Sequence, residues 1–391
     1  MDIEKLGSSP IGKLVPIHGR DARHGEFAYF AFLPQPLPSD IVLDSRTWTC
    51  ASEASTALGK LDQACVHLPN PRLLIHPALW REALDTSALE GTVGLLRDLL
   101  AAQLPSAQFL SPETTEIRAY QLVALTAFEA IKERPISIGL LAELHGQLFR
   151  EIPNPPRDLG RIRQDLVWIG EQDRPIEESR FVPPPADDRL TAGIDAWESW
   201  IQADHKHLPP VVRAALAHYQ FETLHPFGDG NGRLGRLAIV LQLLRSHSIE
   251  EPAVTLSPWF LRRRHEYQDH LFAVSCTGDW NSWIQFFCQA ICEQCLSLIS
   301  GAEKLVEWLN VSRRTLDAKR WTGMIRRLLE DLIEWPVTTI TDTASRYNVS
   351  TMNATRMINH LVEAKILEEM TGRTYARVFG AAAVMEIVDR I

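Results

Sequence analysis

The sequence predicts a mainly helical fold that ends in a separate winged helix-turn-helix module. Apolar residues recur with a helical period through most of residues 187–300. Near the C-terminus, helical patterns over 319–334, 341–347 and 350–364 precede an alternating stretch, 366–379, with Gly372 in its turn. Three helices followed by a hairpin are the pattern of a winged helix-turn-helix.

The composition is that of an ordinary globular chain. The 391 residues allow two to three domains, and 45% apolar with 23% charged residues excludes a disordered chain or a coiled coil. The net charge of −9 disfavours a general polyanion binder and leaves a local basic patch open. The six cysteines form neither a disulfide framework nor a four-ligand zinc site. With no apolar signal or membrane segment, we expect a cytoplasmic protein without a membrane partner.

Proline-rich breaks divide the first part of the chain. Residues 1–40 are mixed in character, and 34–38 must be extended because each proline disfavours helix in the residue before it. Ser39-Asp40 offers an N-cap for a helix over 41–58 or beyond. A further helical stretch is expected over about 76–104.

The middle of the chain combines helices with two short strands. Two helical patterns flank Pro135 within residues 112–149. Residues 166–170 and 180–182 are apolar and border a polar turn, which predicts a pair of strands. Beyond them, the helical pattern resumes at Asp187.

The chemistry is concentrated in one stretch, HPFGDGNGRLGR at residues 225–236. It joins helical patterns over 211–224 and 237–246, so it is a glycine-rich loop that opens into a helix. Glycines let consecutive backbone N–H groups converge into an anion-binding nest, and the helix adds its positive N-terminal end. Arg233 and Arg236 project from one side of the first helical turn. Two guanidinium groups beside such a nest are suited to a polyphosphate.

The remaining residues of the loop fit a reaction on that polyphosphate. Asp229 is a carboxylate among phosphate-binding groups, which is where proteins hold Mg²⁺. His225 lies at the start of the loop and has the ordinary pKa of a general base at neutral pH. Phe227 is the apolar residue expected to anchor the loop in the core. No Gly-Lys-Ser/Thr follows, so the segment is not a Walker A loop.

The stretch resembles the signature of the Fic family, H-P-F-x-[D/E]-G-N-G-R-x-x-R, at every fixed position. The resemblance implies an all-α fold: a Fic-type helical core with a small β-hairpin flap. It also implies transfer of AMP from ATP to a hydroxyl of a target protein, with Mg²⁺ or Mn²⁺. His225 would then deprotonate the target hydroxyl, and Asp229 would hold the metal ion. The implied ATP-binding residues are Phe227, Gly228, Asp229, Gly230, Asn231, Gly232, Arg233, Arg236 and Tyr267.

The resemblance has three further implications, for the anion hole, for the residue at position 232 and for Tyr267. Gly230, Asn231 and Gly232 would form the anion hole, with Asn231 on the α-phosphate and the two arginines on the β- and γ-phosphates. A kinase-type branch carries lysine at position 232, so glycine there fits AMP transfer. Tyr267 falls where the family often places an aromatic residue near the adenine, although packing in the core is an equal alternative.

Two further segments resemble the family. Thr86-Ser87-Ala88-Leu89-Glu90-Gly91 matches the inhibitory motif [S/T]-x-x-x-E-[G/N], and Glu90 would pair with Arg236 and deprive the γ-phosphate of its arginine. Residues 160–170 and 180–185 resemble the flap on which a target segment docks as an added strand. The flap residues concerned are Val167, Trp168, Ile169 and Gly170. Core packing is the alternative role for the side chain of Trp168.

These observations divide the chain into an N-terminal region with the inhibitory helix (1–110), a Fic catalytic core (111–300) and the winged helix-turn-helix (301–391). The leading hypothesis is an autoinhibited protein adenylyltransferase whose partner is a hydroxyl-bearing target protein. Alternatives on the same site are removal of AMP or transfer of another nucleotide or phospho group. Another is an ATP-sensing DNA-binding regulator, although Arg356, Lys365, Arg373 and Arg377 are few cations for DNA. The C-terminal module also fits protein binding or a homodimer.

Overall fold

A computed structural model describes residues 1–67, 70, 72–105, 110–152, 155–171, 174–372 and 375–391. The chain is mostly helical, as predicted, and the strands within these residues form one two-stranded and one three-stranded antiparallel sheet. It divides into two compact units: residues 1–59, 122–250 and 259–292 form unit 1, and residues 60–121, 251–258 and 293–391 form unit 2. The three consecutive domains predicted from the sequence stay a prediction.

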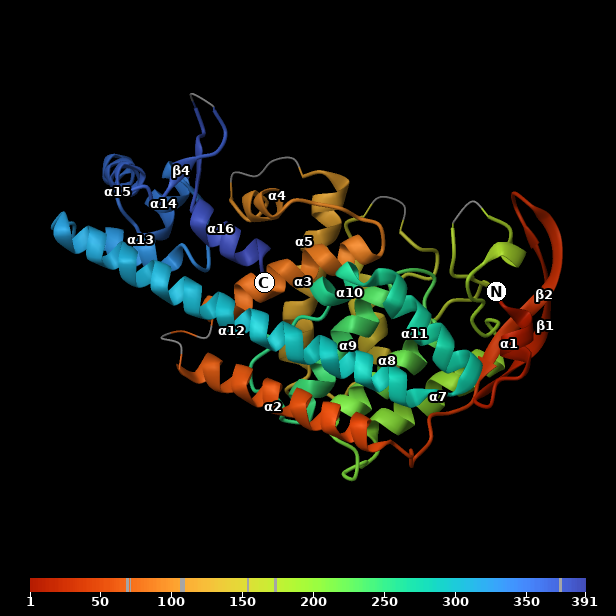
Figure 1. Cartoon of the computed structure of the whole chain (residues 1–391). Helices are drawn as coiled ribbons and strands as arrows, with labels where there is room; N and C mark the ends of the chain where they lie inside the picture. Colours follow the sequence, from red (N-terminus) through yellow and green to blue (C-terminus); the bar gives the residue numbers. More distant parts are fainter. Residues whose placement is uncertain (68–69, 71, 106–109, 153–154, 172–173, 373–374) are drawn as a thin grey trace. The chain divides into compact units, whose positions relative to one another are not determined.

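Unit 1 holds the glycine-rich segment and the elements around it (Figure 1). Its complete elements are α1 (Ile3–Gly7), β1 (Gly12–Asp21), β2 (Gly25–Pro34), α6 (Ile138–Leu148), the 3₁₀ turn η1 (Ile176–Glu178), α7 (Asp188–Gln202), α8 (Pro210–Leu224), α9 (Asn231–Arg245) and α11 (Arg264–Thr277). Four helices contribute residues to both units: α2 (Ser45–His67), α5 (Pro112–Ala130), α10 (Ser257–Arg262) and α12 (Trp280–Ala318).

The core of unit 1 is built around α8 and α9, which are buried on nearly all sides. Almost every residue of α8 from Val211 onward is buried, and so is every residue of α9 from Asn231 to Leu241. Helices that are buried on nearly all sides belong in the centre of a domain. On α7, the indole of Trp197 donates a hydrogen bond to the carbonyl of Ala217 at 3.0 Å. The segment that joins α8 to α9 therefore begins and ends in the most buried part of the unit.

An antiparallel hairpin occupies residues 12–34, where the sequence analysis expected no strand. β1 and β2 pair from Gly12 opposite Pro34 to Asp21 opposite Gly25. Val15, Ile17 and Ala31 are buried on one face. The turn is closed by Asp21, whose carboxylate accepts hydrogen bonds from the N–H groups of the third and fourth turn residues. The sequence contains the alternation of apolar residues that is typical of strands. The proline-rich tract that follows, residues 34–38, led the sequence analysis to miss this pattern.

Two predicted helix boundaries were wrong. α2 begins at Ser45 rather than after Ser39-Asp40, because the carboxylate of Asp44 caps the helix and accepts the Thr47 N–H at 2.7 Å. The helix predicted over 319–334 is α13 (Met324–Asp331) alone. Arg320 and Gly323 before it have φ angles of 57° and 84°, which no α-helix contains.

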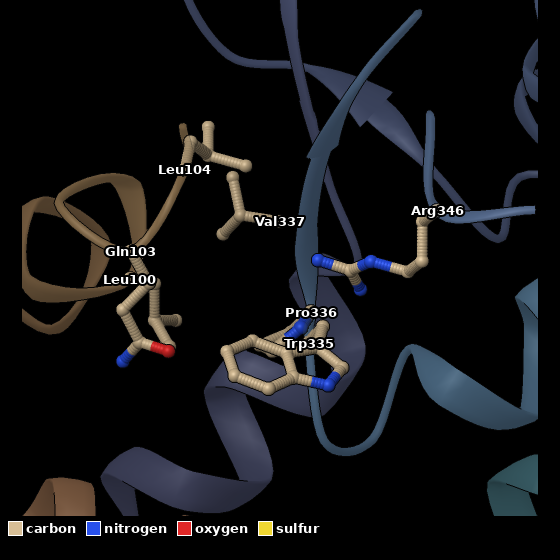
Figure 2. A pocket seen from close by; sticks show the side chains of 7 residues that line it. All are labelled: Leu100, Gln103, Leu104, Trp335, Pro336, Val337 and Arg346. Atoms are coloured by element: carbon tan, nitrogen blue, oxygen red, sulfur yellow. The ribbon is translucent and has the colours of Figure 1, made fainter. Parts of the chain in front are cut away.

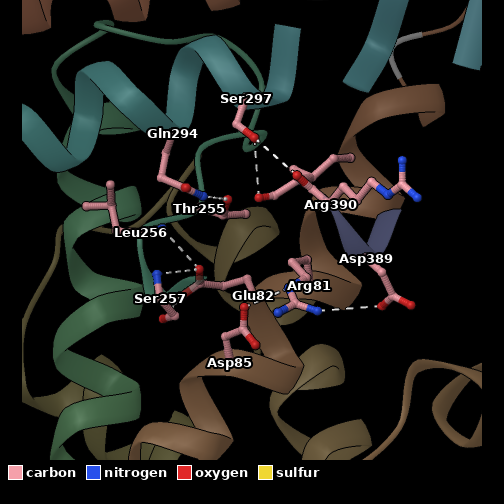
Figure 3. Close-up of polar contacts among 11 residues, drawn as sticks. Arg81, Glu82, Asp85, Thr255, Leu256, Ser257, Gln294, Ser297, Asp389 and Arg390 are labelled. Carbon is pink, nitrogen blue, oxygen red and sulfur yellow. Dashed lines mark hydrogen bonds and ion pairs between the residues drawn. The ribbon is translucent and has the colours of Figure 1, made fainter. Parts of the chain in front are cut away.

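Unit 2 is organised around α3 (Arg72–Leu89) and α16 (Ala382–Asp389), which pack together. Arg81 of α3 pairs with Asp85 at 2.7 Å and with Asp389 of α16 at 3.5 Å (Figure 3). The buried carboxylate of Glu82 accepts the N–H groups of Leu256 and Ser257 at 3.1 and 3.0 Å, as well as the Ser257 hydroxyl (Figure 3). These contacts tie α3 to α16 and to the start of α10.

The predicted helix over 76–104 is interrupted. α3 ends at Leu89, and a shorter helix, α4 (Leu96–Ala101), follows. Gly91 has a φ angle of 102°, and the N–H groups of Glu90, Gly91 and Thr92 bond back to carbonyls of the last turn of α3. A glycine in this conformation ends a helix, so the break falls within the segment that resembles the inhibitory motif.

The C-terminal part of unit 2 comprises α13, β3 (Val337–Thr339), α14 (Ile340–Arg346), α15 (Thr351–Glu363), β4 (Glu368–Glu369) and β5 (Val378–Gly380). The strand order is β3-β5-β4, with antiparallel pairing throughout. Ser350 caps α15, as predicted, by accepting the Asn353 N–H.

A small pocket lies at β3 (Figure 2). Its lining residues are Leu100, Gln103, Leu104, Trp335, Pro336, Val337 and Arg346. The guanidinium of Arg346 lies 5.1 Å from the ring centroid of Trp335 and pairs with Asp342 at 3.2 Å. The cavity volume is about 10 Å³, room for about one water molecule, so it is no nucleotide site.

Over the described residues, no helix combines the length and the apolar character needed to cross a membrane.

Candidate active site

The glycine-rich loop, residues 225–230, joins α8 to α9 through two residues in the left-handed conformation. His225 has φ 51° and ψ 62°, and its N–H donates to the Phe221 carbonyl at 2.9 Å. Gly230 has φ 75° and precedes the first residue of α9. A glycine adopts this conformation freely, whereas a histidine does so only when its surroundings enforce it. His225 is therefore fixed at the C-terminal end of one buried helix, six residues before the first residue of the next helix.

The ring of His225 has a defined proton position. Its Nδ1 lies 3.3 Å from the carbonyl oxygen of Glu222, one turn back in α8. Since a carbonyl oxygen only accepts, Nδ1 carries the proton in the neutral ring and Nε2 is the basic nitrogen. The side chain is half-buried, so a reactant has access to it.

The first residue of α9 closes the loop from within. The Oδ1 of Asn231 accepts the Phe227 N–H at 2.9 Å, and its Nδ2 donates to the Phe227 carbonyl at 2.8 Å. Asn231 is 1% exposed and Phe227 is fully buried, as expected of an anchor. The backbone between them is thus held in one conformation with the N-terminus of α9 behind it.

A buried histidine that the sequence analysis did not identify supports the loop from α6. Nδ1 of His145 accepts the Gly160 N–H at 3.0 Å, which leaves the proton on Nε2, and Nε2 donates to the Asp229 carbonyl at 3.1 Å. The ring also stacks on Phe227, with centroids 4.5 Å apart and planes inclined by 12°. Burial is the main cause that lowers the pKa of His145, so the ring is neutral at physiological pH.

The two arginines of α9 lie inside the protein behind the loop. Arg233 is 1% exposed and Arg236 is 3% exposed. The guanidinium of Arg233 lies 4.9 Å from the ring centroid of Phe149 and 3.5 Å from the carboxylate of Asp229. Guanidinium groups beside a helix N-terminus are suited to an anionic ligand.

Asp229 is the exposed acidic group of the loop. Its side chain is 57% exposed, and Oδ1 accepts the N–H of Gly230. Within the described residues, no group of three or more His, Cys, Asp or Glu side chains is placed to hold a metal ion. Mg²⁺ bound together with a phosphate ligand needs only one or two carboxylates, so the single accessible carboxylate of the glycine-rich loop fits such an ion.

Comparison with known proteins places this arrangement in a family. Residues 135–243 match the family model of the Fic/DOC family, and residues 48–129 match that of the Fic/DOC family N-terminal region. Over these two ranges, the chain is similar to the Fic/DOC family. The prediction made from the motif at 225–236 is confirmed, and the first of the two matched ranges contains the whole glycine-rich loop.

The relatives share part of their length with this chain. "Protein adenylyltransferase Fic" of Culex quinquefasciatus is 31% identical over 152 residues, 39% of this chain and 27% of that protein. The protein of the same name from Nematostella vectensis is 30% identical over 156 residues, 40% of this chain and 32% of that protein. The chain thus matches about a third or less of these curated relatives.

Among solved structures, a Fic family protein from Desulfovibrio desulfuricans G20 superposes with a TM-score of 0.56 and 19% identity. The superposition covers 88% of this chain and 98% of that one. At this level of identity the likeness concerns the fold, and it supports a Fic-type helical fold for most of the chain.

The flap is less regular than predicted. Instead of two strands, the described residues form a single antiparallel bridge between Ile169 and Phe181, with N–H···O distances of 2.8 and 3.1 Å. The second flap segment, residues 180–185, continues beside β2, where the Phe32 N–H donates to the Val182 carbonyl at 2.9 Å. Trp168 is partly buried and meets the ring of Phe27 edge-on at 6.4 Å. Val167 and Gly170 flank these contacts and stay predicted target-docking residues.

The predicted adenine-binding tyrosine lies in the core. Tyr267 is 5% exposed, and its hydroxyl lies 2.7 Å from Nε2 of His218. Its ring stacks on Phe260 with centroids 4.5 Å apart. A role at the adenine stays a prediction, while the packing role is visible.

Glu90 follows the last residue of α3 at a helix C-terminus closed by Gly91. Thr86 and Ser87 of the same motif are fully buried in unit 2. The motif lies within the range that matches the family's N-terminal region. Its predicted inhibitory pairing stays a prediction.

We expect the buried histidines to make the folded protein sensitive to acid. Burial, with a smaller contribution from the charge of Arg236, lowers the pKa of His218 to about 3. The unfolded chain binds a proton at this residue below a pKa of ~6.5 while the folded chain does not, so stability is complete above that pH and falls as pH decreases. The loss approaches ~1.4 kcal/mol per pH unit for each such residue.

Urea unfolding at several pH values between 7 and 5 measures this dependence. The free energy of unfolding of His218→Gln should fall less steeply with decreasing pH than that of the wild type. His265→Gln, which changes an exposed histidine of α11, should keep the wild-type slope. Parallel slopes for wild type and His218→Gln would show that His218 is not the buried neutral group.

Proposed function

We propose that the chain is a protein adenylyltransferase that transfers AMP from ATP to a Ser, Thr or Tyr hydroxyl of a target protein and releases pyrophosphate. The observation that carries the proposal is the geometry of the glycine-rich loop: a histidine with a basic Nε2 stands at one end, and a helix N-terminus with two buried arginines at the other. The names of the curated relatives support the same reaction.

In this reaction the loop binds the triphosphate and His225 takes the proton. The oxygen of the target hydroxyl attacks the α-phosphorus, the bond from the α-phosphorus to the bridging oxygen breaks, and pyrophosphate leaves. The N–H groups at the start of α9 face the phosphates, with Arg233 and Arg236 toward the β- and γ-phosphates. Gly232 leaves the anion hole open, which favours AMP transfer over a kinase-type reaction.

The residues present also fit a divalent cation. The accessible carboxylate of Asp229 would hold Mg²⁺ or Mn²⁺ beside the phosphates, where the ion would neutralise charge on the leaving pyrophosphate. No second carboxylate is required for such an ion.

The C-terminal elements of unit 2 support a second part of the proposal. Strand order β3-β5-β4, with α13, α14 and α15 placed before the β4-β5 pair in the chain, is the arrangement of a winged helix-turn-helix. On α15, Arg356 already bonds to Asn353 at 2.9 Å, and Arg373 lies outside the described residues. We therefore favour protein binding or dimerisation over DNA binding for this module, in a cytoplasmic protein.

Incubation with α-labelled ATP separates the candidate functions. Label on protein supports adenylyl transfer, whereas ATP binding without label supports an ATP-sensing regulator. Loss of label from an already modified target supports AMP removal.

We expect His225→Ala to abolish transfer and keep ATP binding, because the residue moves a proton and lies before the phosphate nest. Removal of a general base typically costs ~10²–10⁴-fold in rate. The measurement is initial rates of label incorporation beside a nucleotide-binding titration. Wild-type labelling by this variant would exclude His225 as the base.

We expect labelling to need Mg²⁺ or Mn²⁺ and to collapse in Asp229→Ala, by on the order of 10²-fold or more. Asp195→Ala removes an exposed carboxylate of α7 and should keep the wild-type rate. Undiminished labelling by Asp229→Ala, or by the wild type in chelator, would contradict the assignment.

We expect Glu90→Gly to raise transfer, including self-modification, by ~10-fold or more, because a partly buried charge pair with Arg236 would be lost. Glu90→Gln tests the charge alone and should also be faster than the wild type. The double variant Glu90→Gly with Arg236→Ala should lose the gain.

Time courses of label incorporation at saturating ATP compare the rates of the wild type, Glu90→Gly, Glu90→Gln and the double variant. If Glu90→Gly is no faster than the wild type, Glu90 is not the inhibitor. If the double variant is as fast as the single one, inhibition does not act through Arg236.

A further inference from the structure

Arg163 is a buried cation whose recorded hydrogen bonds all go to backbone carbonyls. The residue is 3% exposed and belongs to the first flap segment, residues 160–170. Nε donates to the His225 carbonyl at 2.7 Å, and Nη1 donates to the Asp165 carbonyl at 3.0 Å. Nη2 donates to the carbonyls of Pro184 and Leu224 at 2.5 and 3.5 Å. Burial lowers the pKa of Arg163 to about 10, so the group stays charged at neutral pH.

Three of the carbonyls bound by this residue are consecutive. Besides the side-chain bonds to Leu224 and His225, the backbone N–H of Arg163 donates to the Pro226 carbonyl at 2.9 Å. The last carbonyls of a helix lack partners inside the helix and carry its partial negative charge, which a cation complements. A left-handed non-glycine residue costs of order 1–3 kcal/mol unless its surroundings hold it. Arg163 provides such surroundings for His225.

The same guanidinium reaches the other end of the flap. Pro184 belongs to the Pro183-Pro184-Pro185 run that ends the second flap segment, residues 180–185. Prolines have no N–H to donate, so the backbone of this run can form hydrogen bonds only through its carbonyls. One rigid, planar group therefore joins the backbone of His225 to the segment on which the flap ends.

We propose that Arg163 is a positioning residue that fixes the backbone of His225 relative to the flap. The proposal rests on the proposed function, in which the flap holds the target segment and Nε2 of His225 takes the proton of its hydroxyl. Arg163 touches neither reactant. It sets the distance between the base and the docked hydroxyl, and an error of about 1 Å in such a distance can cost ~10²-fold in rate.

Substitutions of Arg163 in the full chain test the proposal by the step they impair. Arg163→Lys keeps the charge and loses the planar fork, so it can satisfy only part of the four carbonyls. We expect kcat for target labelling to fall ~10²-fold, while the dissociation constant for ATP changes by less than about twofold. Arg213→Ala, which removes a half-buried guanidinium from the opposite end of α8, should keep kcat.

Rescue distinguishes positioning from general support of the fold. Millimolar guanidinium, well below denaturing concentrations, should restore a measurable part of kcat in Arg163→Ala, and methylammonium should not. A fall in kcat and ATP affinity together, with no rescue, would overturn the proposal.

Hydrogen–deuterium exchange keeps this test independent of the reaction. In Arg163→Lys, amides of residues 225–230 and 167–170 should exchange faster than in the wild type, and amides of α7 should not change. If the wild type labels no protein, the proposed function fails, and the exchange result still decides whether Arg163 holds the loop and the flap. Unchanged exchange in both segments would overturn the positioning role.

Discussion

The site depends on a left-handed histidine between two buried helices. α8 ends at Leu224 and α9 begins at Asn231, so the backbone must reverse within the glycine-rich loop while both helices stay in the core. A histidine resists the φ angle of 51° that this reversal imposes. Buried side chains compensate from three directions: Arg163 binds its carbonyl, His145 binds the carbonyl of Asp229, and Asn231 brackets Phe227. His225 and Asp229, to which the proposed function gives the chemical roles, stay accessible.

The charge of the site is local and does not follow from the composition. The chain as a whole carries −9, yet the end of α8 and the start of α9 bring together three buried arginines: Arg163, Arg233 and Arg236. The nearby histidines, His145 and His218, have lowered pKa values and stay neutral, so they add hydrogen bonds without adding further buried charge. In the proposed function these arginines act on a polyphosphate at short range, where the net charge of the chain matters little because salt screens distant charges.

Local signals in the sequence predicted local structure well. The loop that opens into a helix, the helices on either side of Pro135, and the capping of α15 by Ser350 are all confirmed. The predicted start of α2 was wrong because Asp44, which lies close to the predicted cap Ser39-Asp40, caps the helix instead. Arg163 and His145 had no local signal. The loop carbonyls that they bind, those of His225 and Asp229, lie 62 and 84 residues away in the sequence. A single arginine or histidine in a helical or loop pattern is ordinary until the fold brings such carbonyls to it.

The flap depends on contacts with the N-terminal hairpin and with Arg163. A segment with one bridge of its own is not stable in water by itself. On one side β2 supports it, through the Phe32–Val182 hydrogen bond and the packing of Phe32 on Phe181 at 5.8 Å. On the other side, Arg163 holds its end to the histidine backbone. Residues 1–34 lie outside both matched family ranges, so this chain supplies part of the flap's support from a segment that the family models do not include. In the proposed function, a flap braced in this way would hold residues 167–170 in place before a target arrives, and the ordering cost of docking would be correspondingly smaller.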